Sequence, residues 1–530
     1  MQTLSRALTL PLYGTLATRR LEQQAAATLA PHTLMQRAGL AVAQLSLALA
    51  PHAQRIWIAC GPGNNGGDGL EAALHLHQWG KTVVVTWLGA QNEEKVPADA
   101  LISLAHARAA GVPFASAAPQ DFDFAIDALL GLGAAPRPAD ASAPNDLLDH
   151  WLTLLRASDR PVLAIDIPSG LDADTGTSFT PELIAASTYL VRAGARFTLS
   201  LLTLKPGLFT ADGRDLAGQL WWDDLGVPVP PHVAPDAWLL GQDRAGWHRR
   251  GQAAHASHKG SFGDVAILGG ASPSDHAADA ASHMTGAALL AGRAALHAGA
   301  GRVFVALLGQ AGITVDPQQP ELMFRSPAAL DLKTQVLVCG CGGGNSVAGV
   351  LPRVLSSALA AVLDADALNA IARDTQLQTQ LRSRQGRGHR TVLTPHPLEA
   401  ARLLGSSAVA VQANRLKAAE QLAAQFQCVV VLKGSGTVIA APDQVPVINP
   451  SGNACLATAG TGDVLAGMLG ALMAGGQTPF DAACCAVFQH GQLADDWAVH
   501  RPGQPLTASA LASSGQDHQT DLQQQEQHQR

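Results

Sequence analysis

The chain has 530 residues, of which 47% are hydrophobic and 15% are charged. This length allows two large α/β domains or about three average ones, each with a sizeable core. The formal net charge is −7 and no stripe of basic residues stands out, so we expect neither nucleic acid nor an anionic membrane as a partner. No apolar stretch reaches the roughly 18 residues that a membrane-spanning helix needs.

The N-terminal half alternates helical and strand-like segments. Apolar side chains recur at helical spacing over residues 34–49, and a second helix is predicted over residues 68–79. Short apolar strands are predicted over residues 55–60, 82–87, 124–130 and 162–166. Continuous apolar strands separated by helices are typical of a parallel sheet that is covered on both faces.

A proline-rich stretch divides this half from a second one. Residues 227–236 contain four prolines, too many for regular structure. The alternation then resumes, with a helix over residues 282–298 and strands over 264–268, 302–307, 335–339, 361–363, 392–393 and 428–432. We predict a first α/β domain over residues 1–226, a linker over 227–240, a second α/β domain over 241–512, and a disordered tail over 513–530.

The cysteines indicate a reducing compartment. Their number is odd and no pair has the spacing of a zinc site, so a disulfide framework is not expected. The seven are Cys60, Cys339, Cys341, Cys428, Cys455, Cys484 and Cys485. The first 20 residues contain arginine but no acidic residue, as transit peptides do, but they lead directly into sequence that looks folded. We therefore expect a cytoplasmic protein.

The strand over residues 55–60 leads into the glycine-rich sequence GPGNNGGDG, residues 61–69. Glycines let the backbone approach a ligand, and the helix that follows favours anions at its N-terminus. The spacing includes GxGxxG, but the next strand ends at Trp87 without the acidic residue that a dinucleotide-binding dehydrogenase uses. A structural tight turn would explain the glycines alone. The three polar residues Asn64, Asn65 and Asp68 favour a ligand site.

Two more carboxylates stand at predicted strand ends. Asp127 precedes LLGLG, and Asp166 begins DIPSG. Each could simply cap a helix. Because ligands of open α/β sheets bind beyond the carboxyl ends of the strands, these two loops and the glycine-rich loop should converge. Their oxygen ligands suit an alkali or alkaline-earth cation.

These motifs resemble the YjeF N-terminal family, the NAD(P)H-hydrate epimerases, over about residues 10–225. The resemblance implies a Rossmann-like three-layer domain that interconverts the R and S forms of NADHX and NADPHX, the hydrates of NADH and NADPH. It implies K⁺ ligands at Asn65, Asp127 and Ser169, and proton transfer by Asp166. It further implies hydrate contacts from Asn64, Asn65, Gly66, Gly67, Asp68, Gly131, Leu132, Gly133, Ala134, Ala135, Pro136, Arg137 and Asp166. Leu132 departs from the family's usual small polar residue.

The second domain contains AGTGDVLAG over residues 459–467, before an apolar helix. Glycines ahead of a helix N-terminus create an anion hole, and Asp463 is placed to take a proton from a hydroxyl that receives a phosphoryl group. A glycine turn with an N-cap aspartate is the structural alternative. Upstream, a strand ends in Lys433 and a small polar loop, which suits nucleotide phosphates. No GxxxxGK[ST] motif is present, so a P-loop kinase is excluded.

Together with HKGSFG at 258–263, DADALN at 364–369 and TPHPLE at 394–399, this motif resembles the YjeF C-terminal family. These are ribokinase-like, ADP- or ATP-dependent NAD(P)H-hydrate dehydratases, and the resemblance covers about residues 245–510. It implies phosphorylation of the C6 hydroxyl of the S-hydrate, loss of phosphate to restore NAD(P)H, and Mg²⁺ with the nucleotide. It implies nucleotide contacts from Lys433, Gly434, Ser435, Gly436, Thr437 and Gly462, and hydrate contacts from Ala287, Gly344, His396 and Asp463.

Several positions of the second domain stay open. His396 could be a capping residue, and Asp364 and Asp366 could solvate a strand end. Two departures from the family are Cys339-Gly340-Cys341, in place of a glycine-proline-glycine turn, and Met284, in place of an aromatic residue.

The leading hypothesis is a bifunctional metabolite repair enzyme, an isomerase joined to a lyase. Its partners would be small-molecule substrates, NADHX, NADPHX and ADP or ATP. We expect a homo-oligomer, although no pattern indicates the number of subunits. One alternative is a ribokinase-type small-molecule kinase with a non-catalytic N-terminal domain. Another is a sensor that only binds the hydrate or a nucleotide.

Overall fold

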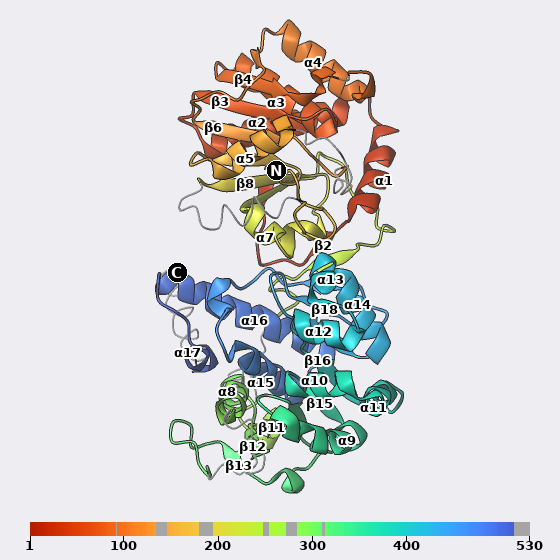
Figure 1. Cartoon of the computed structure of the whole chain (residues 1–530), viewed down its shortest axis with the longest axis vertical. Helices are drawn as coiled ribbons and strands as arrows, with labels where there is room; N and C mark the ends of the chain where they lie inside the picture. Colours follow the sequence, from red (N-terminus) through yellow and green to blue (C-terminus); the bar gives the residue numbers. More distant parts are fainter. Residues whose placement is uncertain are drawn as a thin grey trace. The chain divides into compact units, whose positions relative to one another are not determined.

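The computed structural model describes residues 1–91, 93–133, 146–179, 194–246, 254–271, 284–309 and 313–513. The chain divides into two compact units (Figure 1). The N-terminal unit comprises Met1–Ser5 and Pro11–Ala237, and the C-terminal unit comprises Arg6–Leu10 and Trp238–Arg530. The division lies inside the stretch predicted as a linker.

The described part of the N-terminal unit contains an eight-stranded sheet in the order β1-β9-β8-β7-β6-β3-β4-β5. Its strands are β1 (Gln2–Thr3), β3 (Arg55–Cys60), β4 (Thr82–Trp87), β5 (Phe114–Ala115), β6 (Phe124–Ala128), β7 (Val162–Ile165), β8 (Arg196–Leu201) and β9 (Gln219–Asp223). All neighbours pair in parallel except β1 with β9. The prediction of a largely parallel sheet is confirmed.

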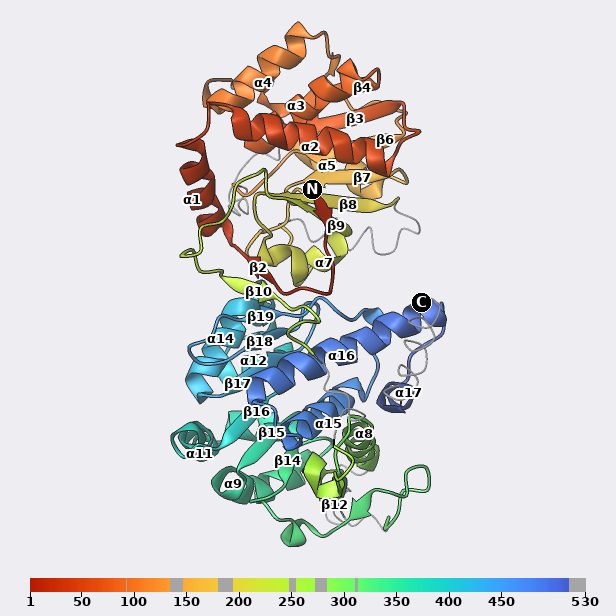
Figure 2. The same ribbon diagram turned by 180° about the vertical axis from the view of Figure 1, so that it is seen from behind.

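Helices cover both faces of this sheet because residues along each strand alternate between two cores. Ile56 and Ile58 of β3 pack with the helices α2 and α3, whereas Trp57 packs with α5 on the opposite face. Figure 2 shows α2 and α3 side by side over the strands. The helices are α1 (Thr15–Ala26), α2 (Thr33–Leu49), α3 (Asn64–Gln78), α4 (Ala98–Ala109), α5 (Asp146–Ala157) and α7 (Gly213–Leu216). Helix α3 begins four residues before its predicted start, so the motif residues 64–68 form its first turn.

The described part of the C-terminal unit contains an eleven-stranded mixed sheet in the order β13-β12-β11-β14-β15-β16-β17-β18-β19-β10-β2. Its strands are β2 (Leu10–Leu12), β10 (Ala237–Leu239), β11 (Asp264–Gly269), β12 (Arg302–Leu307), β13 (Met323–Phe324), β14 (Val336–Cys339), β15 (Ala360–Leu363), β16 (Arg390–Leu393), β17 (Val429–Leu432), β18 (Val438–Ala440) and β19 (Val447–Ile448). The seven strands from β13 to β17 in this order, which include β12 and β11, run parallel, and β18 is antiparallel to β17.

This sheet also separates two cores. Val265 and Ile267 of β11 pack with α8, α15 and α16, whereas Ala266 and Leu268 pack with helices α9 to α12 and α14 on the other face. The helices are α8 (Thr285–His297), α9 (Val347–Ser357), α10 (Asp366–Arg373), α11 (Thr375–Gly386), α12 (Pro397–Leu404), α13 (Ala408–Ala413), α14 (Arg415–Phe426), α15 (Thr461–Ala474), α16 (Pro479–His500) and α17 (Ala508–Ser513). Two α/β domains, as predicted, are confirmed.

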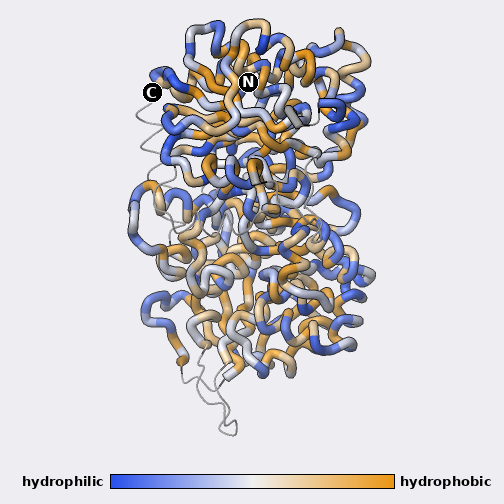
Figure 3. Tube along the Cα trace, turned by 45° about the horizontal axis from the view of Figure 1, so that its top comes forward, coloured by the Kyte–Doolittle hydropathy of each residue, from blue (hydrophilic) through white to orange (hydrophobic). Residues whose placement is uncertain are grey.

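Hydrophobic and hydrophilic stretches interleave through both units, with hydrophilic segments prominent along the outer edges (Figure 3). Among the described residues, no helix combines the length and apolarity needed to cross a membrane. The end of the predicted linker differs from expectation, since Ala237–Leu239 is strand β10 and pairs with β19. Of the predicted tail, Ser513 ends α17, and residues 514–530 lie outside the described residues.

Candidate functional sites

Three loops of the N-terminal unit converge at the carboxyl ends of β3, β6 and β7. The side-chain nitrogen Nδ2 of Asn65 donates a hydrogen bond to the carbonyl oxygen of Leu130, at 3.0 Å. The hydroxyl of Ser169 donates to Oδ1 of Asp127 at 2.5 Å and accepts from the backbone N–H of Leu130 at 2.8 Å. Asn65 and Ser169 therefore both contact the backbone of Leu130, and Asp127 joins them through Ser169.

The chemistry of this group suits a hard cation. Asp127 is 6% exposed and Ser169 is 1% exposed. Burial raises the pKa of Asp127, while hydrogen bonds from Ser169 and from the N–H of Leu129 oppose that effect. A carboxylate, a hydroxyl and a side-chain amide oxygen are the ligand types that K⁺ and similar ions accept.

Close packing of the backbone explains two of the glycines. A Cβ atom on Gly61 would lie 1.8 Å from the carbonyl oxygen of Leu129, and one on Gly66 would lie 1.9 Å from that of Gly61. Gly63 has nothing within 4 Å of such an atom. Gly61 and Gly66 are therefore required by close backbone packing, whereas Gly63 is not.

Asp166 follows β7 and faces a lysine that we did not expect. Its backbone adopts the left-handed φ of 66°, an unfavourable conformation for a residue other than glycine. Its Oδ1 accepts hydrogen bonds from the N–H of Leu201, at 3.0 Å, and from Nζ of Lys205. Lys205 is 0% exposed, and burial lowers its pKa while the charge of Asp166 opposes that change. The pair is a buried acid and base at the sheet edge.

Asp68 lies near this pair. Burial is the main cause that raises its pKa well above the ordinary value, and the charges of Asp166 and Glu22 add to it. Gly131, Leu132 and Gly133 are described, and the carbonyl oxygen of Leu132 accepts a hydrogen bond from Arg19, at 3.4 Å. The remaining expected hydrate contacts, Ala134, Ala135, Pro136 and Arg137, lie outside the described residues.

The C-terminal unit has a second group of charges at the carboxyl ends of β14, β15, β16 and β17. Asp364, 1% exposed, accepts hydrogen bonds at Oδ1 from the hydroxyl of Thr394, at 2.7 Å, and from Nζ of Lys433, at 2.8 Å. Burial acts to lower the pKa of Lys433, but the nearby carboxylates of Asp364 and Glu399 outweigh it and the pKa is raised. Lys433, whose side chain is 20% exposed, is therefore held as a partly buried cation at the sheet edge.

Asp463 occupies the third position of α15, in the same group. Burial, with a smaller contribution from the charge of Asp364, raises the pKa of Asp463 to about 6. Cys341 hydrogen-bonds to Asp463, and burial raises the pKa of its thiol well above the ordinary value. Cys341, Asp364 and Asp463 each place one atom within 4.8 Å of the others. At neutral pH, Asp463 is an ionised carboxylate of raised basicity.

The loop after β17 is hydrogen-bonded to the side chain of Arg415, which is 0% exposed. Its Nη2 donates to the carbonyl oxygens of Leu432, Lys433 and Gly436, at 3.2, 3.2 and 3.4 Å. Gly434 has a φ of 137°, and a Cβ atom there would lie 2.8 Å from the guanidinium of Arg415. The expected nucleotide residues 433–437 thus form one braced loop. Gly462 adjoins it, since a Cβ on Gly462 would lie 3.3 Å from Nζ of Lys433.

The expected hydrate residues of this unit have distinct local roles. The N–H of Gly344, whose φ is 52°, donates to Oδ2 of Asp366, at 2.8 Å. Ala287 lies in the first turn of α8, where a Cβ on Gly342 would approach it to 2.9 Å. His396 caps α12, because its Nδ1 accepts from the N–H groups of Leu398 and Glu399. The capping role considered for His396 is therefore real, and Nε2 is left as its second polar atom, 3.3 Å from Oε1 of Glu399.

Two family models and a relative that spans nearly the whole chain match this protein. The family model described as "YjeF-related protein N-terminus" matches residues 31–207, and the one described as "NAD(P)H-hydrate dehydratase" matches residues 280–514. The bifunctional NAD(P)H-hydrate repair enzyme Nnr of Escherichia coli (strain K12) is 36% identical over 518 residues, which cover 94% of this chain and 91% of that protein. The chain belongs to the bifunctional NAD(P)H-hydrate repair enzyme family.

Two further proteins each match about half of the chain. The ADP-dependent (S)-NAD(P)H-hydrate dehydratase of Neisseria meningitidis is 40% identical over 255 residues, 46% of this chain and 79% of that protein. A crystal structure of the ADP/ATP-dependent NAD(P)H-hydrate dehydratase from Bacillus subtilis, co-crystallised with ATP and Mg²⁺, has a TM-score of 0.43 and 30% identity and covers 52% of this chain and 94% of that chain. The family resemblance inferred from the motifs is confirmed.

Sequence reasoning missed several polar residues of this family member's sites. Lys205 and Arg415 lie outside the motifs, and each acts on a partner remote in sequence. His490 is another: its Nε2 lies 2.9 Å from the carbonyl oxygen of Thr461, and burial lowers its pKa to about 4, so a neutral ring supports the start of α15. For Lys205, the only signal was a single lysine directly after the mostly apolar run 201–204, and no local pattern marks Arg415 or His490.

Proposed function

We propose that the two units catalyse successive steps of NAD(P)H-hydrate repair, with the N-terminal unit as the epimerase and the C-terminal unit as the dehydratase. Membership of the family supports the pair of activities. The observation that carries the assignment of residues is shared by the two units: a buried aspartate paired with a lysine at the carboxyl ends of parallel strands. The units would correspond to a first domain over residues 1–226 and a second over residues 241–512.

In the N-terminal unit, Asp166 transfers the proton. Inversion at C6 requires the C6–N1 bond of the ring to break, as the C6 hydroxyl becomes a carbonyl, and to form again on the other face of that carbonyl. Asp166 accepts the hydroxyl proton while N1 keeps the electron pair of the broken bond. When the bond forms again Asp166 returns the proton to oxygen, so none is consumed. Nζ of Lys205 hydrogen-bonds to Oδ1 of Asp166 and holds this carboxylate in place. Residues 64–68 and 131–137 hold the hydrate.

Asn65, Asp127 and Ser169 fit a potassium ion, since all three supply hard oxygen atoms. Bound there, K⁺ would supply a positive charge that orients an oxygen of the substrate. The protein's own contribution is the network through Leu130, which holds the three side chains at one point.

In the C-terminal unit, Asp463 takes the proton of the C6 hydroxyl while the hydroxyl oxygen attacks the terminal phosphorus of ADP or ATP, and AMP or ADP leaves. Departure of phosphate from C6, with loss of a proton from C5, restores the double bond of NAD(P)H. Lys433, Gly434, Ser435, Gly436, Thr437 and Gly462 bind the nucleotide, and Ala287, Gly344, His396 and Asp463 contact the hydrate. Mg²⁺ bound with the nucleotide would neutralise phosphate charge.

Two assays test the proposal separately. Purified chain with ADP or ATP, Mg²⁺ and S-NADHX should produce NADH, and absence of NADH would refute the dehydratase. With R-NADHX, the wild type should accelerate epimerisation and Asp166→Asn should not. The exposed Asp159→Asn is the matched control. Equal, spontaneous rates in wild type and Asp166→Asn would instead favour a unit that only binds the hydrate.

The state of the cysteines supports a proposal on where in the cell the reaction takes place. All seven cysteines are unpaired, and Cys455 alone among them is not fully buried. We propose the cytoplasm as the location, because free thiols persist in a reducing compartment. A homo-oligomer remains our expectation, and light scattering of the purified chain would test it.

A further inference from the structure

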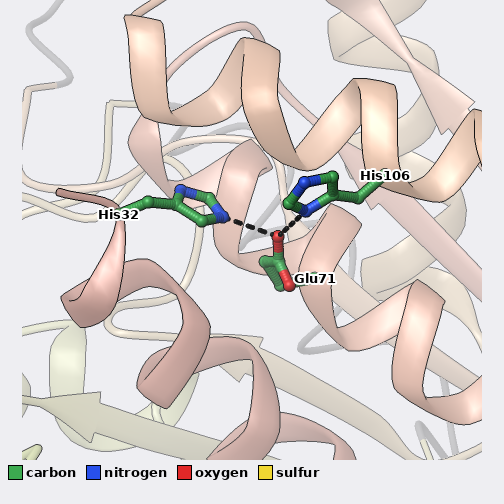
Figure 4. Close-up of side chains that lie close together, drawn as sticks. All are labelled: His32, Glu71 and His106. Atoms are coloured by element: carbon green, nitrogen blue, oxygen red, sulfur yellow. Dashed lines mark hydrogen bonds and ion pairs between the residues drawn. The ribbon is translucent and has the colours of Figure 1, made fainter. Parts of the chain in front are cut away.

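A cluster of two histidines and one glutamate lies in the helical layer of the N-terminal unit and has no part in the reaction proposed above. His32 immediately precedes α2, Glu71 lies on α3 and His106 lies on α4. Figure 4 shows the three side chains pointing toward one another. Nε2 of His32 is 2.8 Å from Oε1 of Glu71, and Nδ1 of His106 is 3.6 Å from the same oxygen.

The atom types and distances fit a metal centre. Two imidazole nitrogens and a carboxylate oxygen form the protein ligand set of many zinc sites. With metal–ligand bonds of about 2.0–2.1 Å and tetrahedral angles, two ligand atoms lie about 3.4 Å apart. The separations of 2.8 and 3.6 Å lie on either side of this value, so small movements of the side-chain ends would admit an ion.

The surroundings of His32 provide a second, independent observation. Its side chain is only 6% exposed, and its Nδ1 is a buried atom without a hydrogen-bond partner in the described structure. Oδ1 of Asp99 lies 3.9 Å from this nitrogen. When Nε2 of a histidine binds a metal, Nδ1 carries the proton and a carboxylate commonly accepts it. Asp99, which is 47% exposed, can make that contact after a small movement.

We propose that His32, Glu71 and His106 bind one divalent transition-metal ion, with Zn²⁺ the best match, and that Asp99 orients His32 through its Nδ1. His106, 48% exposed, is the ligand through which the ion enters, and water completes the coordination. The ion would link the start of α2, the middle of α3 and the last turn of α4. Glu71 follows Asp68 by one helical turn, so the site supports the turn of α3 that carries the epimerase motif.

Zinc titration of the full-length chain, stripped of metal with a chelator, tests this site. The wild type should bind one more equivalent of Zn²⁺ than His106→Gln, and Zn²⁺ should raise the unfolding temperature of the wild type but not that of His106→Gln. Asp99→Asn should lower the affinity for Zn²⁺ by about 10- to 100-fold. His52→Gln, which removes an exposed histidine outside the cluster, should behave as wild type. Co²⁺ should give visible d–d bands that His106→Gln abolishes.

Because His106 and Asp99 are both exposed, neither substitution opens a cavity, and each variant should fold. The measured quantity is the difference between variants, so Zn²⁺ bound elsewhere on the chain cancels. Equal stoichiometry and equal affinity in the wild type and in His106→Gln would overturn the proposal and leave the cluster as a hydrogen-bonded His–Glu pair. An unchanged affinity in Asp99→Asn would overturn the role of Asp99.

Discussion

Replacing Asp463 with asparagine should abolish dehydration and stabilise the C-terminal unit at the same time. Burial raises the pKa of Asp463 from the usual 3.8 to about 6. The folded protein therefore binds this proton more tightly than the unfolded chain does, and ionisation of Asp463 opposes folding at neutral pH. The difference of about two pH units corresponds to about 3 kcal/mol, at about 1.36 kcal/mol per unit. Solvent around the half-buried carboxylate makes this an upper limit.

The sign of the effect depends on pH. Above about pH 6 the wild type carries the unfavourable charge, so the asparagine variant should be more stable by up to the full amount. Between about pH 6 and about pH 4 the advantage should decrease, and below that it should vanish, because Asp463 is then protonated in both states. The wild-type dehydration rate should fall about tenfold per pH unit below about pH 6, since the base must be ionised.

Denaturant unfolding of the full chain and NADH formation from S-NADHX are the two measurements. Loss of the general base should reduce dehydration by about 10²- to 10⁴-fold. Asp481→Asn is the matched control, since Asp481 holds the same third position in α16 but is exposed. An asparagine variant that stays active would refute the base assignment. One that is less stable than the wild type at neutral pH would refute the electrostatic reasoning.

Three further predictions follow from the packing of the sites. Gly61→Ala should destabilise the N-terminal unit and impair epimerisation, because its Cβ would collide with a backbone carbonyl, whereas Gly63→Ala should be neutral; thermal unfolding and the epimerase assay compare the two. Lys205→Met should cost about 3–5 kcal/mol in unfolding free energy, because it leaves Asp166 as a buried unpaired charge; a loss below 1 kcal/mol would contradict the ion pair. Arg415→Met should raise the KM for ADP or ATP at least about tenfold by releasing three loop carbonyls, each worth about 1–3 kcal/mol when left unpaired; an unchanged KM would mean that the loop does not need this brace.

The sequence alone was enough to predict the fold class and to locate the motifs in the chain. Runs such as residues 55–60 and 82–87 are apolar at every buried position except Thr86, so their strands could be located with the correct bounds. The glycine-rich motifs begin helices α3 and α15, which local composition indicates through backbone freedom and helix N-termini. Even here α3 began earlier than predicted, because glycine and asparagine are poor helix formers and mask a first turn that tertiary packing stabilises.

Only the tertiary structure decided which distant side chains meet. Lys205 reaches Asp166 because parallel pairing of β7 with β8 brings the segment after β8 to the same sheet edge. Lys433 reaches Asp364 because β15, β16 and β17 run parallel, so the segments after β15 and β17 lie at the same edge of the sheet. His32, Glu71 and His106 meet because three helices pack on one face. Hydrophobic periodicity specifies which face of an element is buried, but it carries no information on which polar residue of another element lies opposite.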